Sequence, residues 1–573
     1  MKKTKKLLAA LLGLACAVSA LSGCGKDAPA SEPASSQSSE TVSSSEAETT
    51  ETFDARKITE GVKLVISAQE QSKIVDYETN AITKRIEEDL GVDLEFVTFP
   101  AADYASKINI MVESGDKLPD IIFMPTNKLV SWAEQEAIIP LNKYYEDPNF
   151  SANIRAAGER LNQDLSEYMA NADGIIYGVP QYGGSLGGQY AQKLWVYQPW
   201  LDAIGADIPT TTEEFYEVCK QIASKDINGN GIADELMISG CNTGGGQTWM
   251  NYLMTPFVYA HDSRYLVVED GTLSFAYTSE GWKEGLKYIH RFFDEGLFVQ
   301  EVLTQDPDQY WAQVYSETPS VFSFVGYHYA NAQLENRVNY ACIPALKNGE
   351  DGRALSYYNP GFPNATNPGA VISADCENPD AAFLVCDYLC DEDISISQRY
   401  GEQGINWDHW EDAKVENRDA YESAFPGYEI SIFLYDNDQF WAGTDAQEIC
   451  YLQKCPFIFD VGVPSGKAVL KEGATEQEKL QARADKILNT AIVECSKYAP
   501  TEVVGYMPLT GEESARISEL TSTITSFVSQ SRAEFLTGIK DIDGQWDAYL
   551  NELEKMGVKE LLEIYQGAYD RVH

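Results

Sequence analysis

The stretch VKLVISAQEQSKIVDYETNAITKRIEEDLGVDLEFVTFP, residues 62–100, decides the fold class because two strand-like segments flank an amphipathic helix. Its opening, VKLVISA, and its end, VDLEFVTFP, are rich in β-branched and apolar residues and predict strands. The segment between them, residues 79–91, predicts a helix with Thr79 as N-cap and Gly91 as stop. This order predicts a pair of parallel strands joined by a helix.

The same alternation continues along the chain. Residues 103–116 predict a second helix, and LPDIIFMP, residues 118–125, predicts a largely apolar strand of the kind that is covered on both faces. Much later, residues 369–393 again have the pattern of a strand, a loop and a helix. We therefore expect an α/β fold with a parallel sheet, whose ligand site lies beyond the carboxyl ends of the strands.

The length of the chain predicts two lobes. Roughly 515 residues follow the N-terminal segments, which is more than one hydrophobic core usually holds. Helical patterns fill 210–225 and 279–296, and the C-terminus from about residue 474 is mostly amphipathic helix. We expect the first lobe to comprise residues 58–193 and 369–430, and the second 194–368 and 431–573.

The N-terminus predicts export and a lipid anchor. Residues 1–23 have a lysine-rich head and an apolar run that is too short to span a bilayer, which is typical of a secretory signal. The ending Leu21-Ser22-Gly23-Cys24 resembles the lipobox of bacterial lipoproteins, in which the cysteine carries fatty acyl chains such as palmitate. We expect Cys24 to hold the protein on the outer side of the cell membrane; the alternative is an ordinary signal peptide.

Residues 24–57 are dominated by Ser, Thr, Glu, Ala and Pro and predict a disordered tether after the lipidated cysteine. The formal net charge of the whole chain is -45. A field of this sign repels nucleic acid and anionic headgroups, so we expect no nucleic-acid partner. After the signal and Cys24, the cysteines are odd in number and contain no CxxC pair, which predicts buried free thiols.

The segment DINGNGIADE, residues 226–235, has the layout of a cation-binding loop. Calcium prefers six to eight oxygen ligands, and alternate polar side chains around a glycine turn can supply them. An EF-hand would close the shell with Glu at the twelfth position, where this chain has Met237, so Glu235 must take that role. The predicted structural Ca²⁺ ligands are the side chains of Asp226, Asn228, Asn230, Asp234 and Glu235 and the carbonyl of Ile232. The alternative is a solvated turn.

Several stretches together resemble the extracellular solute-binding lipoproteins of ABC importers, in the carbohydrate-type group called family 1. They include the lipobox, LPDIIFMP, DGIIYGVPQY, KDINGNGIADE, VISADCENPDAAFLVCDYL and the ending FLTGIKDIDGQWDAYLNELEKMGVKELLEIYQGAYDR. The resemblance implies a type II periplasmic-binding-protein fold, in which a hinge with chain crossovers joins two α/β lobes. It also implies an oligosaccharide receptor that delivers its ligand to an ABC permease and works as a monomer.

Aromatic residues in loops rich in Gly, Pro or Asn are the candidates for sugar binding, because sugar C–H faces pack on aromatic rings. The predicted ligand-binding residues are Tyr182, Trp249, Tyr327, Tyr358 and Trp407. Core or hinge packing is the alternative for each of them.

An enzyme is less well supported by the sequence. GGSLG, residues 183–187, matches the nucleophile elbow G-x-S-x-G around Ser185, but the flanking segments are not those of a strand and a helix. The five histidines show no HExxH motif. We expect no catalysis; the alternatives are a surface polysaccharide-degrading enzyme or a receptor of the same fold for peptides or other solutes.

Overall fold

The computed structural model describes residues 53–573, apart from 72, 126–128, 185, 242–248, 260–263, 299, 327–331, 359–367, 426, 428–429, 436–450, 452–453, 461 and 463–468. The predicted signal, Cys24 and most of the tether therefore lie outside the described residues. Within the described part, no helix is long and apolar enough to cross a membrane.

The opening stretch folds as its pattern predicts. Strand β1 (Lys63–Gln69) pairs in parallel with β2 (Asp93–Phe99) on one side and with β3 (Ile121–Phe123) on the other. Leu64 and Ile66 are completely buried, as expected for a central strand. The parallel strands and their connecting helices are thus confirmed.

Helix α2 (Ala81–Leu90) connects β1 to β2. Its N-cap is Asn80, whose side chain accepts a hydrogen bond from the Ile82 N–H, so the prediction of Thr79 was wrong by one residue. Thr79 instead donates its hydroxyl to Asp76. The predicted stop is confirmed, because Gly91 has a left-handed conformation with φ 71°.

The complete first sheet is mixed rather than parallel. Its strand order is β13-β4-β10-β3-β1-β2. Strand β10 (Pro368–Ile372) is antiparallel to both β3 and β4 (Val179–Gly184), whereas β13 (Phe457–Asp460) is parallel to β4. The chain thus returns to this sheet twice after leaving it.

The boundary that we expected between residues 430 and 431 is therefore placed too early. Strand β12 (Ile432–Leu434) pairs with β11 (Trp407–His409), and β13 completes the first sheet. Tyr451 and Ile458 are buried in the core of this first lobe. Its helices are α1 (Arg56–Thr59), α3 (Tyr104–Ser114), α4 (Leu129–Glu134), α5 (Asn142–Glu146), α6 (Ala152–Leu161), η1 (Glu167–Met169), α14 (Pro379–Leu389), α15 (Glu392–Tyr400) and α16 (Arg418–Ala424).

The second lobe is built on a three-stranded antiparallel sheet. Strand β5 (Lys193–Tyr197) lies between β8 (Ser323–Gly326) and β9 (Tyr340–Ile343). A separate hairpin is formed by β6 (Leu266–Glu269) and β7 (Thr272–Phe275). Helices of this part are α7 (Leu186–Gln189), α8 (Gln198–Ile204), α9 (Thr212–Ala223), α10 (Trp249–Met254), η3 (Ala276–Thr278), α11 (Glu280–Asp294), η4 (Gln300–Leu303), α12 (Pro307–Val314) and α13 (Leu334–Arg337).

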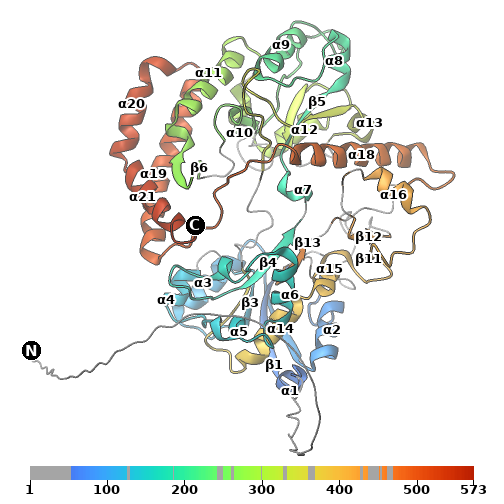
Figure 1. Ribbon diagram of the computed structural model, residues 1–573, viewed down its shortest axis with the longest axis vertical. Helices are drawn as coiled ribbons and strands as arrows, with labels where there is room; N and C mark the ends of the chain where they lie inside the picture. Colours follow the sequence, from blue (N-terminus) through green and yellow to red (C-terminus); the bar gives the residue numbers. More distant parts are fainter. Residues whose placement is uncertain are drawn as a thin grey trace, which may run out of the picture. The chain divides into compact units, whose positions relative to one another are not determined.

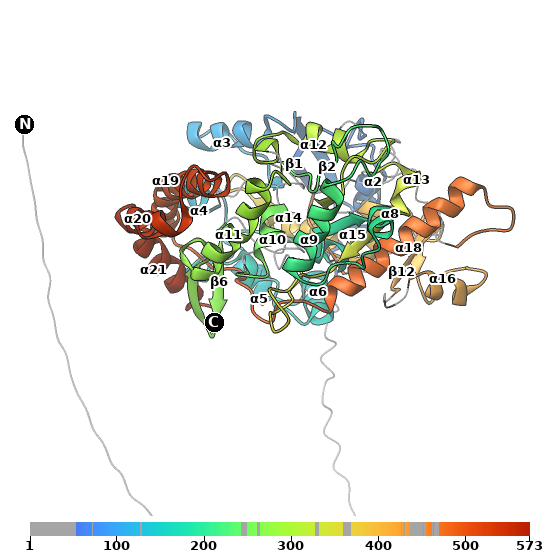
Figure 2. The same ribbon diagram turned by 90° about the horizontal axis from the view of Figure 1, so that it is seen from above.

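Four helices form the C-terminal part, as predicted. They are α18 (Glu476–Ser496), α19 (Gly511–Leu536), α20 (Ile542–Lys555) and α21 (Val558–Tyr569). Figure 1 shows α19, α20 and α21 packed together beside α11, and Figure 2 shows the same group from above. Their buried side chains join those of β5, β8 and β9 in one hydrophobic core, which is distinct from the core of the first sheet. The mixture of strands and helices confirms the predicted α/β class, and the two largest hydrophobic clusters of the described residues lie around the six-stranded and the three-stranded sheet.

Candidate ligand-binding site

Three tyrosines from distant parts of the chain, Tyr190, Tyr259 and Tyr358, lie in contact with one another. The ring of Tyr190 lies 5.4 Å from the ring of Tyr358, with 45° between the two planes. The Tyr259 hydroxyl donates to the Tyr358 carbonyl over 3.0 Å and also accepts from the Tyr358 N–H over 3.3 Å. Residue 358 is thus fixed through its backbone, while its half-buried ring remains partly accessible.

The hydroxyls of this tyrosine cluster stay protonated at neutral pH. Burial raises the pKa of Tyr190 to about 12. Burial also raises the pKa of Tyr358 and of Tyr259 above the ordinary value. Neutral phenols beside aromatic faces can both stack on a ligand and exchange hydrogen bonds with its hydroxyls.

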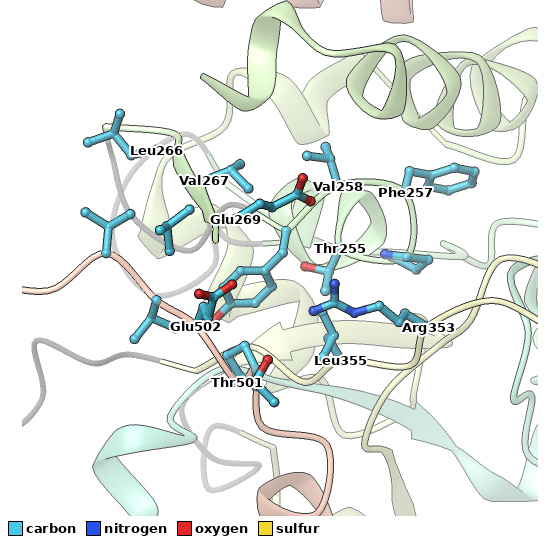
Figure 3. Close-up of a pocket in the computed structure, with 16 residues that line it drawn as sticks. Thr255, Phe257, Val258, Leu266, Val267, Glu269, Arg353, Leu355, Thr501 and Glu502 are labelled. Carbon is cyan, nitrogen blue, oxygen red and sulfur yellow. The ribbon is translucent and has the colours of Figure 1, made fainter. Parts of the chain in front are cut away.

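A pocket of about 180 Å³ adjoins the cluster, because Tyr259 forms part of its wall. Figure 3 shows its lining, which includes the side chains of Glu269, Arg353 and Glu502 gathered around the same space. The apolar part of the wall includes Leu266 and Val504, which are buried. An apolar surface with a few converging polar groups is the usual composition of a small-molecule site.

The charged side chains at the pocket are exposed and differ in their contacts. Glu502 accepts the Asp270 N–H over 3.3 Å through its Oε2 atom. Arg353 forms no ion pair with any residue that the structure describes. Among the described residues Arg353 therefore has no carboxylate partner, although the whole chain has 88 acidic and 43 basic residues. Its guanidinium is available as a hydrogen-bond donor toward a ligand.

The five aromatic residues that the sequence predicts as ligand contacts lie in different environments in the structure. Tyr358 lies in the cluster just described, and Tyr182 is buried on β4 with 5% of its surface exposed. Trp249 and Trp407 are interior residues, with 1% and 0% exposed. The Trp407 indole N–H donates to the Gly401 carbonyl over 2.8 Å, and the Trp249 ring packs edge-on against Phe298. Tyr327 lies outside the described residues, as does Ser185 of the GGSLG motif.

Sequence reasoning missed Tyr190 and Tyr259. Tyr190 follows Gly187 and Gly188, so the criterion of an aromatic residue in a glycine-rich loop could have found it. No local signal marks Tyr259, because its role depends on contact with a residue 99 positions away.

The loop at residues 226–235 winds tightly around its own side chains. The Gly231 N–H donates to Asp226 Oδ2 over 2.9 Å, and the Ile232 N–H donates to Asn230 Oδ1 over 2.8 Å. Glu235 Oε1 accepts the N–H groups of Ile227 and Asn228 at 2.8 and 3.0 Å. Gly229 and Gly231 have positive φ angles of 74° and 89°, which explains the two glycines.

The remaining predicted metal ligands also lie in this loop. Asn228 Oδ1 accepts the Asn230 N–H over 2.9 Å, and Asp234 Oδ1 accepts the Asn230 side-chain amide over 3.0 Å. Each of the three carboxylates keeps a second oxygen that bonds to no described residue, which suits a hard cation. No three His, Cys, Asp or Glu side chains in the described part are grouped closely enough to hold a metal ion. The predicted set of ligands differs from such a group because it also includes two side-chain amides and the backbone carbonyl of Ile232. The side chain of Ile232 is 63% exposed.

Comparison with known proteins gives the family. The sequence profile of the bacterial extracellular solute-binding proteins matches residues 72–393. The fructooligosaccharide ABC transporter substrate-binding protein FusA of Streptococcus pneumoniae is 24% identical over 511 residues, which are 86% of this chain and 86% of FusA. The lipoprotein LipO of Bacillus subtilis is 24% identical over 227 residues, which are 39% of this chain and 42% of LipO.

Solved structures give the same fold. FusA in complex with kestose has a TM-score of 0.63 at 23% identity, covering 89% of this chain and 99% of FusA, and an EF-hand mutant of FusA with fructo-nystose gives the same values. The HMO-binding, ABC-transporter-associated protein of Bifidobacterium longum infantis has a TM-score of 0.70 at 19% identity, covering 89% and 99%. The expected periplasmic-binding-protein-like fold is confirmed. Because the family profile covers more than half of its length, the chain belongs to the bacterial extracellular solute-binding protein family.

Proposed function

We propose that the protein is a lipid-anchored extracytoplasmic receptor that captures an oligosaccharide between its lobes and delivers it to an ABC permease. The observation that carries this proposal is the tyrosine cluster of Tyr190, Tyr259 and Tyr358 beside the pocket that contains Arg353. Family membership and the similarity to FusA, which is described as a fructooligosaccharide receptor, support the ligand class and the transporter.

The proposed contacts follow from sugar chemistry. One face of a sugar ring is rich in C–H groups and packs against the Tyr358 ring, while hydroxyls bond to phenols and to the Arg353 guanidinium. The net charge of -45 disfavours a polyanionic ligand, so the ligand is a neutral sugar. The receptor is a monomer and performs no catalysis. Tyr182 and Tyr327 remain proposed ligand contacts; the buried Trp249 and Trp407 act as packing residues.

A titration screen tests this function. Isothermal calorimetry with neutral di- to hexasaccharides should give saturable binding by at least one of them, and peptides of similar mass should give none. Chromatography of the bound sugar after release should recover it intact. A shortened product would favour the polysaccharide-degrading enzyme, and binding of peptides alone would favour the receptor for other solutes.

Membrane attachment through Cys24 is the second part of the proposal. The similarity to LipO, which is named as a lipoprotein, supports it, together with the lipobox-like sequence. In the bacterial host, Cys24→Ser should move the protein from the membrane fraction to the soluble extracytoplasmic fraction. Labelling with a palmitate analogue should be lost in the same variant. Retention in the membrane with full labelling would contradict attachment at this residue.

We further propose that the loop formed by Asp226, Asn228, Asn230, Ile232, Asp234 and Glu235 holds a structural Ca²⁺. The free carboxylate oxygens described above support it, as does the existence of an EF-hand mutant of the related FusA. The ion gathers oxygen atoms of this one ten-residue loop, which follows α9, and holds the loop in a single conformation.

Removal of calcium should therefore lower the stability of the protein. If calcium is present at about 100 times its Kd, chelation costs about 2.7 kcal/mol, which for a protein of this size corresponds to a fall in Tm of roughly 2–4 °C. Calorimetry in EGTA, with and without restored Ca²⁺, measures it. Glu235→Gln keeps an acceptor for the Ile227 and Asn228 N–H groups but removes the charge, and should abolish the response. The matched control is Glu411→Gln, an exposed site outside the loop, which should respond like the wild type. An unchanged Tm in EGTA would contradict the site.

A further inference from the structure

Two cysteines from distant elements lie with their sulfur atoms in contact. Cys342 is on β9 and Cys495 is in the last turn of α18, and their Sγ atoms are 3.9 Å apart. They are 153 positions apart in the sequence. Cys495 is only 2% exposed, while Cys342 is partly exposed. Both are free thiols, so the contact is between two sulfhydryl groups and not a disulfide.

A buried lysine is part of the same cluster. Lys193, at the start of β5, is 1% exposed and donates its ammonium to the carbonyls of Tyr190 and Ala191. Burial lowers the pKa of Lys193 to about 8, and the two neighbouring cysteines act in the opposite direction. At neutral pH the ammonium form therefore predominates, and it places a positive charge within electrostatic reach of both sulfur atoms.

The two thiols are not equivalent. The hydrogen bond from Cys342 and the charge of Lys193 lower the pKa of the Cys495 thiol. Burial raises the pKa of the Cys342 thiol. The cluster therefore favours one thiolate next to one protonated thiol, which is the arrangement that supports oxidation of a dithiol.

We propose that Cys342 and Cys495 are a modification site, an oxidisable dithiol that forms a disulfide between β9 and α18 when the protein meets a small peroxide. The Cys495 thiolate attacks one oxygen of hydrogen peroxide, the O–O bond breaks, and the leaving hydroxide takes a proton to become water. The Cys342 sulfur then attacks the resulting sulfenic acid, and a second water leaves as the S–S bond forms. Two electrons pass from the two thiols to the peroxide.

The position of the disulfide determines its effect. It ties the end of α18 to the edge of the three-stranded sheet, directly beside Lys193 and the Tyr190 carbonyl. A cross-link over this sequence distance constrains the unfolded chain strongly, so oxidation should raise the Tm of the second lobe by about 5 °C or more. The same link restrains the backbone that carries Tyr190, whose ring contacts Tyr358.

Peptide mapping of the full chain tests the proposal. The reduced protein is treated with one equivalent of hydrogen peroxide, free thiols are blocked with a maleimide, and the unreduced digest is analysed by mass spectrometry. The expected result is a linked pair of peptides that contain Cys342 and Cys495, together with the rise in Tm, both reversed by dithiothreitol. This measurement on the wild-type protein tests the proposal even if a variant fails to fold.

Three variants test which residues the formation of the link requires. Cys495→Ser should abolish the link and the rise in Tm, whereas Cys386→Ser, a buried cysteine of α14, should keep both. Lys193→Met should slow formation of the link about tenfold, because less Cys495 is ionised. The proposal is overturned if peroxide modifies other cysteines while this pair stays reduced. It is also overturned if Cys495 passes to sulfinic acid without forming the link.

Discussion

Trp249→Ala should lower the free energy of unfolding of the second lobe by about 3–5 kcal/mol, the range found when large aromatic residues are removed from cores. The indole is 1% exposed at the start of α10, and its ring packs edge-on against Phe298 at 5.7 Å. Urea unfolding followed by fluorescence and circular dichroism measures the loss. Affinity for the sugar, measured where the variant is still folded, should change less than twofold.

Gly240 provides the matched test of this packing. A Cβ atom at residue 240 would lie 2.2 Å from Trp249 Cδ1, so Gly240→Ala should destabilise the wild type by about 1–3 kcal/mol. In the Trp249→Ala background the same change should cost little, because the indole is gone. An equal loss of stability on Gly240→Ala in both backgrounds would contradict the packing role of Trp249. A stable Trp249→Ala variant that fails to bind sugar would indicate that Trp249 contacts the ligand.

Tyr358→Ala should weaken oligosaccharide binding about 10- to 100-fold, which corresponds to roughly 1.4–2.7 kcal/mol. The substitution removes the accessible ring, but it leaves the backbone bonds to the Tyr259 hydroxyl in place. The thermal midpoint without ligand should therefore change by only a few degrees. Calorimetric titration with the best sugar from the screen measures the affinity.

Two further variants separate stacking from other effects. Tyr358→Phe keeps the ring and should lose at most about fivefold in affinity, the contribution of one hydroxyl bond. Tyr315→Ala removes a tyrosine that is 50% exposed at the end of α12 and should bind like the wild type. Wild-type affinity in Tyr358→Ala would exclude this ring from the site and leave Arg353 as the next residue to replace.

Much of the fold follows from local sequence patterns. The β1–α2–β2 unit could be predicted because its apolar spacing and its terminal Gly91 are properties of neighbouring residues. The antiparallel direction of β10 could not, since the sequence of a buried strand does not encode which way its neighbour runs. The position of β13 was missed for the same reason, because its pairing with β4 is a contact between distant segments.

In the candidate site, too, features formed by neighbouring residues could be predicted and contacts between distant residues could not. The layout of the loop at 226–235 could be predicted from the sequence because its side chains form hydrogen bonds to residues of the same ten-residue segment. The aromatic candidates were harder to rank, since a tryptophan after a glycine-rich stretch can point to solvent or start a buried helix, as Trp249 does. The tyrosine cluster combines residues 190, 259 and 358, and only tertiary structure brings them together.

The late return of β13 to the first sheet has a consequence for biosynthesis. About 270 residues separate the end of β4 from its partner β13, and at roughly 5–20 residues per second a ribosome needs about 15–55 s to make them. During that interval the nascent first lobe has an unpaired edge and lacks Tyr451 and Ile458 from its interior. Any premature stop before residue 457 leaves both halves unfinished, so truncated products should be substrates for proteolysis rather than stable fragments.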